Sequence, residues 1–205
     1  ELIFNRDMQI PKTIIGDSLR LSQVLVNILG NSIKFTEKGE VSLEIKIENK
    51  DENSSFLLFI ICDTGIGMGE ETLNTIFNSF TQADASTSRK YGGTGLGLTI
   101  TKNLIELMDG KIFVESKLGI GSKFIVKIPF TMDKTETKID YKLTNDITIN
   151  LYSLSNSILK IMKEILSSLH IKYKEIEDIS SINSDYEKNI VITEDDEVTY
   201  LNKRF

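Results

Sequence analysis

The feature that most limits the possible folds is an apolar run over residues 56–61 that leads into an aspartate and a series of glycines. A continuous apolar run of this length predicts a central strand. Asp63 follows it, and Gly65, Gly67 and Gly69 alternate after the acid. Because glycine lets the backbone approach a ligand closely, the pattern favours a ligand-binding loop, although a tight structural turn would use the same residues.

An amphipathic helix is predicted upstream, beginning at Asp17 or Ser18, because apolar residues then recur at intervals of three and four. Its polar face carries Asn27 and Asn31, four residues apart, and Lys34. Amide oxygens suit a hard cation, and a lysine suits a phosphate. A solvated helix face is the alternative explanation of the same stripe.

A second glycine series, over residues 92–97, ends a polar stretch and opens a helix predicted over residues 96–108. Backbone N–H groups of a glycine loop at a helix N-terminus form an anion site. Arg89 and Lys90 lie just before it and would neutralise phosphate, unless they are ordinary surface charges. The first glycine series does not fit the dinucleotide-binding pattern, and the second does not fit the P-loop pattern.

The remaining periodicity predicts an α/β sandwich over residues 1–131, a polar linker over 132–145 and a smaller α/β segment over 146–205. In the sandwich, strands are expected within residues 1–15 and at 41–47, 111–115 and 123–130, and a short helix at 73–80. Gly110 follows the expected end of the 96–108 helix. In the smaller segment, strands are expected at 147–151, 171–176 and 189–193, and a helix at 158–169.

Composition excludes some functions. The net charge of −6 argues against a nucleic-acid surface. The single cysteine, Cys62, indicates a reducing compartment and is interpreted as a buried small hydrophobe. No stretch is long and apolar enough to span a bilayer. Because Glu1 is not a methionine, the chain is expected to come from a longer protein, so these features say nothing of membrane attachment elsewhere in it.

Four segments, residues 27–36, 63–68, 76–84 and 92–98, together resemble the histidine-kinase-type ATP-binding domain. That domain is one branch of the ATPase superfamily that includes DNA gyrase, the Hsp90 chaperone and the MutL repair proteins. The resemblance covers about residues 1–130. It implies an α+β fold of the Bergerat type, a two-layer sandwich of a mixed sheet packed on helices, and binding of ATP and Mg²⁺.

The resemblance also implies residue roles. Asn31, with Asn27 beside it, would ligate Mg²⁺, and Lys34 would contact phosphate. Phe35 would wall the adenine, and Asp63 would accept its amino hydrogen. Residues 81–95 would form a mobile lid. The other nucleotide-binding residues that it implies are Gly65, Gly67, Met68, Phe80, Arg89, Lys90, Gly93, Thr94, Gly95, Leu96, Gly97 and Ser122.

The hydrolysing branches carry a glutamate four residues before the metal-binding asparagine, where this chain has Asn27. An amide takes no proton, so transfer to a histidine on a separate helical hairpin is expected, and then to a response-regulator receiver domain. The only histidine, His170, is expected at a helix end. The isolated chain should therefore be unable to phosphorylate itself. It is expected to be a monomer, because dimerisation in this family depends mainly on helices that this chain lacks, and to be cytoplasmic. A non-catalytic nucleotide-binding scaffold, a regulatory module of a hybrid kinase and a hydrolase remain alternatives.

The second segment resembles part of a receiver domain. A working receiver needs acids after its first strand and an aspartate at the end of its third. Here no acid follows the first strand, and Glu194 falls near the acceptor position, with Asp195 and Asp196 after it. We expect a degenerate receiver-like segment with a docking or regulatory role, although these acids would also suit a solvated turn.

Overall fold

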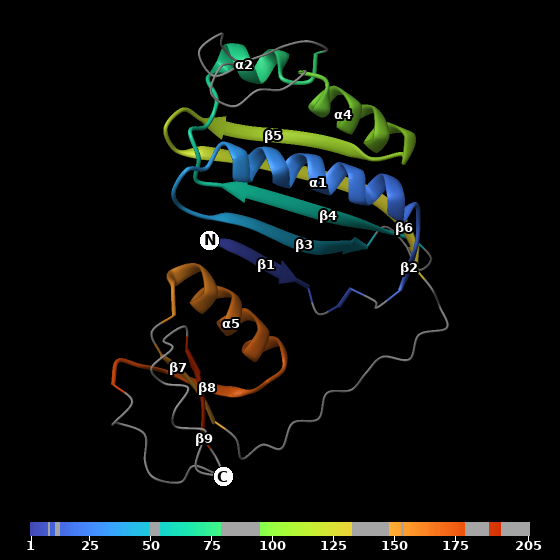
Figure 1. The fold of residues 1–205 in the computed structure, drawn as a ribbon. Helices are drawn as coiled ribbons and strands as arrows, with labels where there is room; N and C mark the ends of the chain where they lie inside the picture. The colour runs from blue at the N-terminus through green and yellow to red at the C-terminus, as the bar shows by residue number, and fades with distance from the viewer. Residues whose placement is uncertain are drawn as a thin grey trace. The chain divides into compact units, whose positions relative to one another are not determined.

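The computed structural model describes residues 1–7, 9–10, 13–49, 54–78, 95–132, 148–152, 154–178 and 189–193. Figure 1 shows their helices and strands. The chain divides into two compact units, Glu1–Glu136 and Thr137–Phe205, called unit 1 and unit 2.

A six-stranded mixed sheet forms one layer of unit 1, with strand order β1-β3-β4-β6-β2 and β5 also paired to β6. Only the β1–β3 pair is parallel; the other pairs are antiparallel. The predicted apolar run lies in β4, which is central, between β3 and β6. The strands are β1 (Leu2–Arg6), β2 (Ile14–Ile15), β3 (Val41–Asn49), β4 (Ser54–Asp63), β5 (Lys111–Lys117) and β6 (Gly121–Met132).

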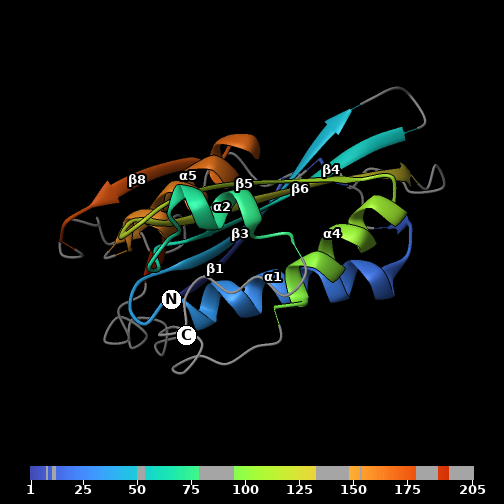
Figure 2. The same cartoon turned by 90° about the horizontal axis from the view of Figure 1, so that it is seen from above.

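Helices form the second layer of unit 1. Helix α1 (Ser18–Lys34) lies beside α4 (Gly97–Leu107) on one face of the sheet (Figures 1 and 2). Asp17 is the N-cap of α1, as predicted, since its carboxylate accepts a 2.9 Å hydrogen bond from the Arg20 N–H. The two-layer α+β fold is confirmed. None of the helices in the described ranges is long and apolar enough to cross a membrane.

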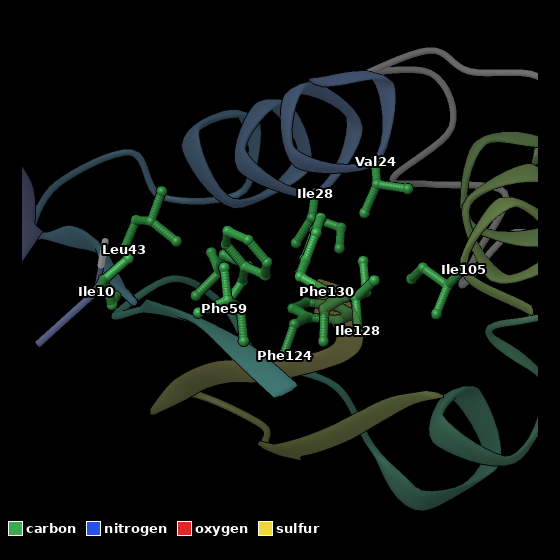
Figure 3. Close-up of a cluster of buried hydrophobic side chains, with 12 residues drawn as sticks. Ile10, Val24, Ile28, Leu43, Phe59, Ile105, Phe124, Ile128 and Phe130 are labelled. Atoms are coloured by element: carbon green, nitrogen blue, oxygen red, sulfur yellow. The ribbon is translucent and has the colours of Figure 1, made fainter. Parts of the chain in front are cut away.

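The core of unit 1 lies between these layers (Figure 3). Val24 and Ile28 of α1 and Ile105 of α4 are completely buried against the sheet. Alternate residues of β4 and β6 point at them, among them Phe59 and Ile128, because side chains of a strand alternate between faces. Each such side chain contributes about 1.5–3 kcal/mol on burial. The core therefore holds α1 and α4 against the sheet, which positions their polar faces.

Cys62 departs from the sequence-based interpretation. It lies on the other face of β4 from the core and is only half-buried. The run over residues 56–61 is apolar on both faces, so its composition did not distinguish the core-facing residues from the outer ones. Partial burial nevertheless raises the pKa of the Cys62 thiol.

One predicted helix of unit 1 was misplaced, and another ends as expected. Helix α2 spans Glu70–Thr75 instead of residues 73–80, because Glu70 and Glu71 favour a helix start. The apolar residues after it belong to a turn, in which the Asn78 N–H donates to the Thr75 carbonyl. Gly110 follows the end of α4, as predicted, and the left-handed residue there is Asp109, with φ +56°. A Cβ atom at Gly110 would stand 2.7 Å from a β6 carbonyl oxygen, so close packing explains that glycine.

Unit 2 contains a small parallel sheet with strand order β8-β7-β9. Its elements are β7 (Thr148–Tyr152), α5 (Asn156–Ser168), β8 (Lys172–Ile176) and β9 (Asn189–Thr193). Ile149 and Leu151 of β7 and Leu166 of α5 form its core. His170 follows α5 with φ +55° and is exposed, which agrees with a helix-end position.

Candidate functional site

The Asp63 carboxylate lies at the end of β4, where three elements meet. Asp63 is 9% exposed and stands opposite Val41 of β3 and Ser122 of β6. Its Oδ1 atom accepts hydrogen bonds from the N–H groups of Gly65 at 3.0 Å and Ser122 at 3.2 Å. The Ser32 hydroxyl of α1 donates to Oδ2 at 3.2 Å. A buried carboxylate needs such donors, and they fix its orientation.

The loop that follows β4 lies against neighbouring backbone in a way that only glycine permits. Gly67 has φ +63°, and a Cβ atom there would stand 2.0 Å from the Lys117 carbonyl oxygen. A Cβ atom on Gly65 would stand 2.3 Å from the Phe35 carbonyl oxygen. The Ile66 N–H donates to that same oxygen at 3.2 Å. The two glycines therefore let the loop pack directly between the end of α1 and the turn that joins β5 to β6.

Ser116 fixes the other side of this loop. The Met68 N–H donates to Ser116 Oγ at 2.8 Å. The Ser116 hydroxyl can donate to either of two acceptors, the Gly121 carbonyl oxygen at 2.8 Å or Ser122 Oγ at 3.1 Å. Sequence reasoning singled out Ser122 and missed Ser116. The sequence did offer one indication of its role. Because side chains alternate along a strand, Ser116 is a polar residue at a position of β5 that faces the core.

The polar stripe of α1 runs from the middle of the helix to its end. Asn27, Asn31 and Lys34 are all half-buried. Asn27 Nδ2 donates to the Thr101 hydroxyl of α4 at 2.8 Å. The Asn31 carbonyl accepts from the Phe35 N–H at 3.0 Å, and Lys34 Nζ lies 5.3 Å from the centre of the Phe35 ring. The stripe thus begins at the contact with α4 and ends beside the loop after β4.

The start of α4 meets the middle of this stripe. Gly95 has φ +69°, and Leu96 is the N-cap. The Leu96 side chain makes no capping hydrogen bond and the first turn of α4 holds no acid, so within the described residues no side chain offsets the positive end of the helix dipole. A Cβ atom on Gly97 would stand 2.7 Å from Asn27 Oδ1. The glycine therefore lets α4 begin directly against the Asn27 amide.

These contacts join most of the predicted site residues into one region. Ser32 and Phe35 connect α1 to the loop after β4, and Asn27 connects α1 to the start of α4. Five predicted residues lie outside the described ones: Phe80, Arg89, Lys90, Gly93 and Thr94.

The donor set determines which metal this region could hold. Among the described residues, no three His, Cys, Asp or Glu side chains group closely enough for a metal ion. The amides of Asn27 and Asn31 offer neutral oxygens, which are hard ligands. Such a set fits Mg²⁺ when phosphate oxygens complete its coordination, as Mg²⁺ is commonly bound with substrate phosphates.

Comparisons with known proteins agree with this arrangement. The family described as "Histidine kinase-, DNA gyrase B-, and HSP90-like ATPase" matches residues 16–132. Hybrid signal transduction histidine kinase A of Dictyostelium discoideum is 49% identical over 133 residues, 62% of this chain and 6% of that protein. The peroxide stress-activated histidine kinase mak2 of Schizosaccharomyces pombe is 38% identical over 193 residues, 89% of this chain and 8% of that protein. The chain spans less than a tenth of the length of these two relatives.

The fold is also similar to that of a solved structure. The crystal structure of full-length ShkA in complex with AMPPNP superposes with a TM-score of 0.69 and 27% identity, over 88% of this chain and 36% of that one. The mak2 and ShkA matches cover more of the chain than unit 1 contains, so both continue into unit 2. The chain belongs to the histidine kinase-, DNA gyrase B- and HSP90-like ATPase family, and residues 16–132 are the ATPase catalytic domain of a two-component sensor histidine kinase.

Proposed function

We propose that unit 1 binds Mg-ATP and donates the γ-phosphoryl group to a histidine on a separate helical hairpin. The observation that carries the proposal is the Asp63 carboxylate, which is buried and oriented by Ser32, Gly65 and Ser122. A fixed, desolvated acceptor of this kind selects for a ligand with an amino hydrogen, such as that of adenine. A ligand without one would leave the buried carboxylate oxygen without a donor, which costs binding free energy.

The adenine would lie against the loop after β4. Gly65 and Gly67 shape that loop, Met68 is fixed by Ser116, and Ser122 supports the Asp63 carboxylate. Phe35, half-buried at the end of α1, would cover one face of the base. Apolar walls with a few fixed polar groups are the usual composition of a small-molecule site.

The phosphates would lie between α1 and the start of α4. Asn31 and Asn27 would hold Mg²⁺, Lys34 would contact phosphate, and Gly95, Leu96 and Gly97 would present the helix N-terminus. When bound, Mg²⁺ neutralises charge on the β- and γ-phosphates. The roles of Phe80, Arg89, Lys90, Gly93 and Thr94 stay predictions from sequence.

The residues on the polar stripe favour transfer over hydrolysis. Asn27 stands where a hydrolysing relative would place a glutamate, and its amide is hydrogen-bonded to Thr101. An amide does not activate water as a general base. Phosphoryl transfer depends mainly on positioning and charge stabilisation, so an external histidine would serve as the nucleophile. The phosphoryl group would then pass to the receiver domain of a response regulator.

The test is to mix the chain with a separately produced histidine-bearing helical hairpin of a histidine kinase and ATP labelled at the γ-phosphate. We expect acid-labile phosphohistidine on the hairpin, and none on a hairpin whose acceptor histidine is replaced by glutamine. Fast release of labelled inorganic phosphate without the hairpin would indicate a hydrolase instead. Nucleotide binding without transfer to several kinase hairpins would favour a non-catalytic scaffold.

We also propose that unit 2 is a receiver-like regulatory segment. Its parallel β8-β7-β9 sheet and the continuation of the mak2 and ShkA matches into it support this. The acids Glu194, Asp195 and Asp196 lie outside the described residues. We expect no phosphorylation on incubation with acetyl phosphate. Labelling at Asp195 or Asp196 would show that the segment keeps receiver chemistry.

A further inference from the structure

Thr101 makes a contact that the proposed roles leave unexplained. It lies in the middle of α4, is 1% exposed, and its Oγ1 accepts a 2.8 Å hydrogen bond from Asn27 Nδ2. The two residues are 74 positions apart in the chain. A hydrogen bond to such a buried hydroxyl is shielded from competition by water.

The bond determines which end of the Asn27 amide faces away from Thr101. An asparagine amide keeps its shape when it is turned by half a rotation, but this exchanges the oxygen and the nitrogen. Only the oxygen can ligate a cation. A threonine hydroxyl inside a helix can donate to the carbonyl one turn earlier, which leaves its lone pairs for an N–H donor. With Nδ2 held at Thr101, Oδ1 is the atom left for a ligand.

We infer that Thr101 is a positioning residue that orients Asn27 for the metal of the bound nucleotide and couples Asn27 to α4. The inference rests on the proposed nucleotide site. Gly97 supports the coupling, because the absence of a Cβ atom there lets the first turn of α4 lie against the same amide. A displacement of α4 would therefore move or release the Asn27 oxygen. The start of α4 thus influences a metal ligand on α1 without touching the metal.

The first test compares Thr101→Val, which keeps the shape of the side chain without the hydroxyl, with Thr101→Ser, which keeps the hydroxyl. Affinities are measured for a non-hydrolysable ATP analogue with Mg²⁺ and for adenosine. We expect Thr101→Val to weaken the magnesium-dependent binding about 10-fold, as is typical when a partner that orients a metal ligand is lost. Adenosine binding should be retained, which also shows that the site is folded. Thr101→Ser should restore the magnesium-dependent affinity.

A double variant tests whether Thr101 and Asn27 act together. If Thr101 acts through the Asn27 amide, Thr101→Val should have no further effect on magnesium-dependent binding once Asn27→Ala is present. Independent, additive losses would overturn the inference. So would an equal loss of adenosine binding in Thr101→Val, or a Thr101→Ser variant that behaves like Thr101→Val.

A spectroscopic test needs no nucleotide, so it separates this inference from the proposed function. The Asn27 side-chain amide protons should exchange slowly with water in the unsubstituted chain, and faster, with a changed nitrogen shift, in Thr101→Val. An unchanged Asn27 signal would overturn the positioning role even if ATP binds well. A changed signal in a chain that binds no nucleotide would keep the contact and contradict the nucleotide site.

Discussion

The Ser32 hydroxyl donates a 3.2 Å hydrogen bond to the Asp63 carboxylate, across 31 residues of sequence. Ser32 is 2% exposed and lies on α1 directly after Asn31, whereas Asp63 ends β4. One buried contact therefore connects the helix that carries the proposed metal ligand to the carboxylate proposed to bind the base. The relative position of the two groups depends on it.

Replacing Ser32 by alanine should weaken both the fold and the site. The carboxylate loses a buried donor, so we expect the free energy of unfolding to fall by about 1–2 kcal/mol. Adenosine affinity should fall as well, because Oδ2 loses the bond that fixes its direction. Ser22→Ala, on the exposed face of the same helix, is the matched control for denaturant unfolding and adenosine titration. Adenosine affinity equal in the two variants would contradict the role given to Ser32.

Two glycine substitutions should have opposite effects on stability. Gly67→Ala forces a left-handed residue to carry a Cβ atom against the Lys117 carbonyl, so we expect a loss of at least about 2 kcal/mol. At Gly30, inside α1, a Cβ atom meets nothing within 4 Å. Gly30→Ala should therefore stabilise by about 0.5–1 kcal/mol. Denaturant titrations of both variants measure the difference, and a neutral Gly67→Ala would show that the loop is not held as described.

Asn31→Ala should separate the phosphate end of the site from the base end. Asn31 lies on the polar stripe of α1 between Asn27 and Lys34, whereas Asp63 and the loop after β4 would hold adenine. We expect the affinity for an ATP analogue with Mg²⁺ to fall about 10-fold or more, because a metal ligand is lost. Adenosine affinity should change little. Calorimetric titrations with both ligands decide the point, and an equal loss for the two would refute the metal role.

Cys62 should give a small, signed pH dependence. Burial raises the pKa of its thiol, and Glu44 and Asp63 act in the same direction, against the opposing charge of Lys123. Above the ordinary thiol pKa of about 8.5, the unfolded chain therefore loses this proton first, and the contribution to stability falls as pH rises. The unfolding free-energy difference between the unsubstituted chain and Cys62→Ala should shrink between about pH 7.5 and pH 9.5. A constant difference, measured under reducing conditions, would contradict the raised pKa.

The sequence was sufficient for the elements whose patterns are long. The three-and-four spacing on α1 and the apolar run of β4 predicted a helix and a central strand, and both are present. The short helix α2 was misplaced because Leu73, Ile76 and Phe77 indicate which side of the segment faces inward but do not indicate where the helix begins or ends. Only the Glu70–Glu71 pair at the true start carried that information, through the helix dipole.

Contacts between distant segments were beyond local patterns. Ser116 and Thr101 contribute to the site region through one hydroxyl each, and their periodicity indicates only that they face inward, not that they contact a ligand-binding residue. Their positions depend on strand register and on how closely α4 approaches α1, which is set by Gly97. The ligand was inferred from the resemblance to a family, whereas the residues that orient Asp63 and Asn27 were identified only in the structure.

The most direct test of the nucleotide site is a calorimetric titration of a non-hydrolysable ATP analogue, with and without Mg²⁺, into this chain and into Asp63→Asn. Asparagine keeps the shape of the side chain but places an amide donor among the donors that surround Asp63. We predict magnesium-dependent binding by the unsubstituted chain and a loss of about 1–3 kcal/mol in Asp63→Asn. Equal binding by both chains would contradict the account.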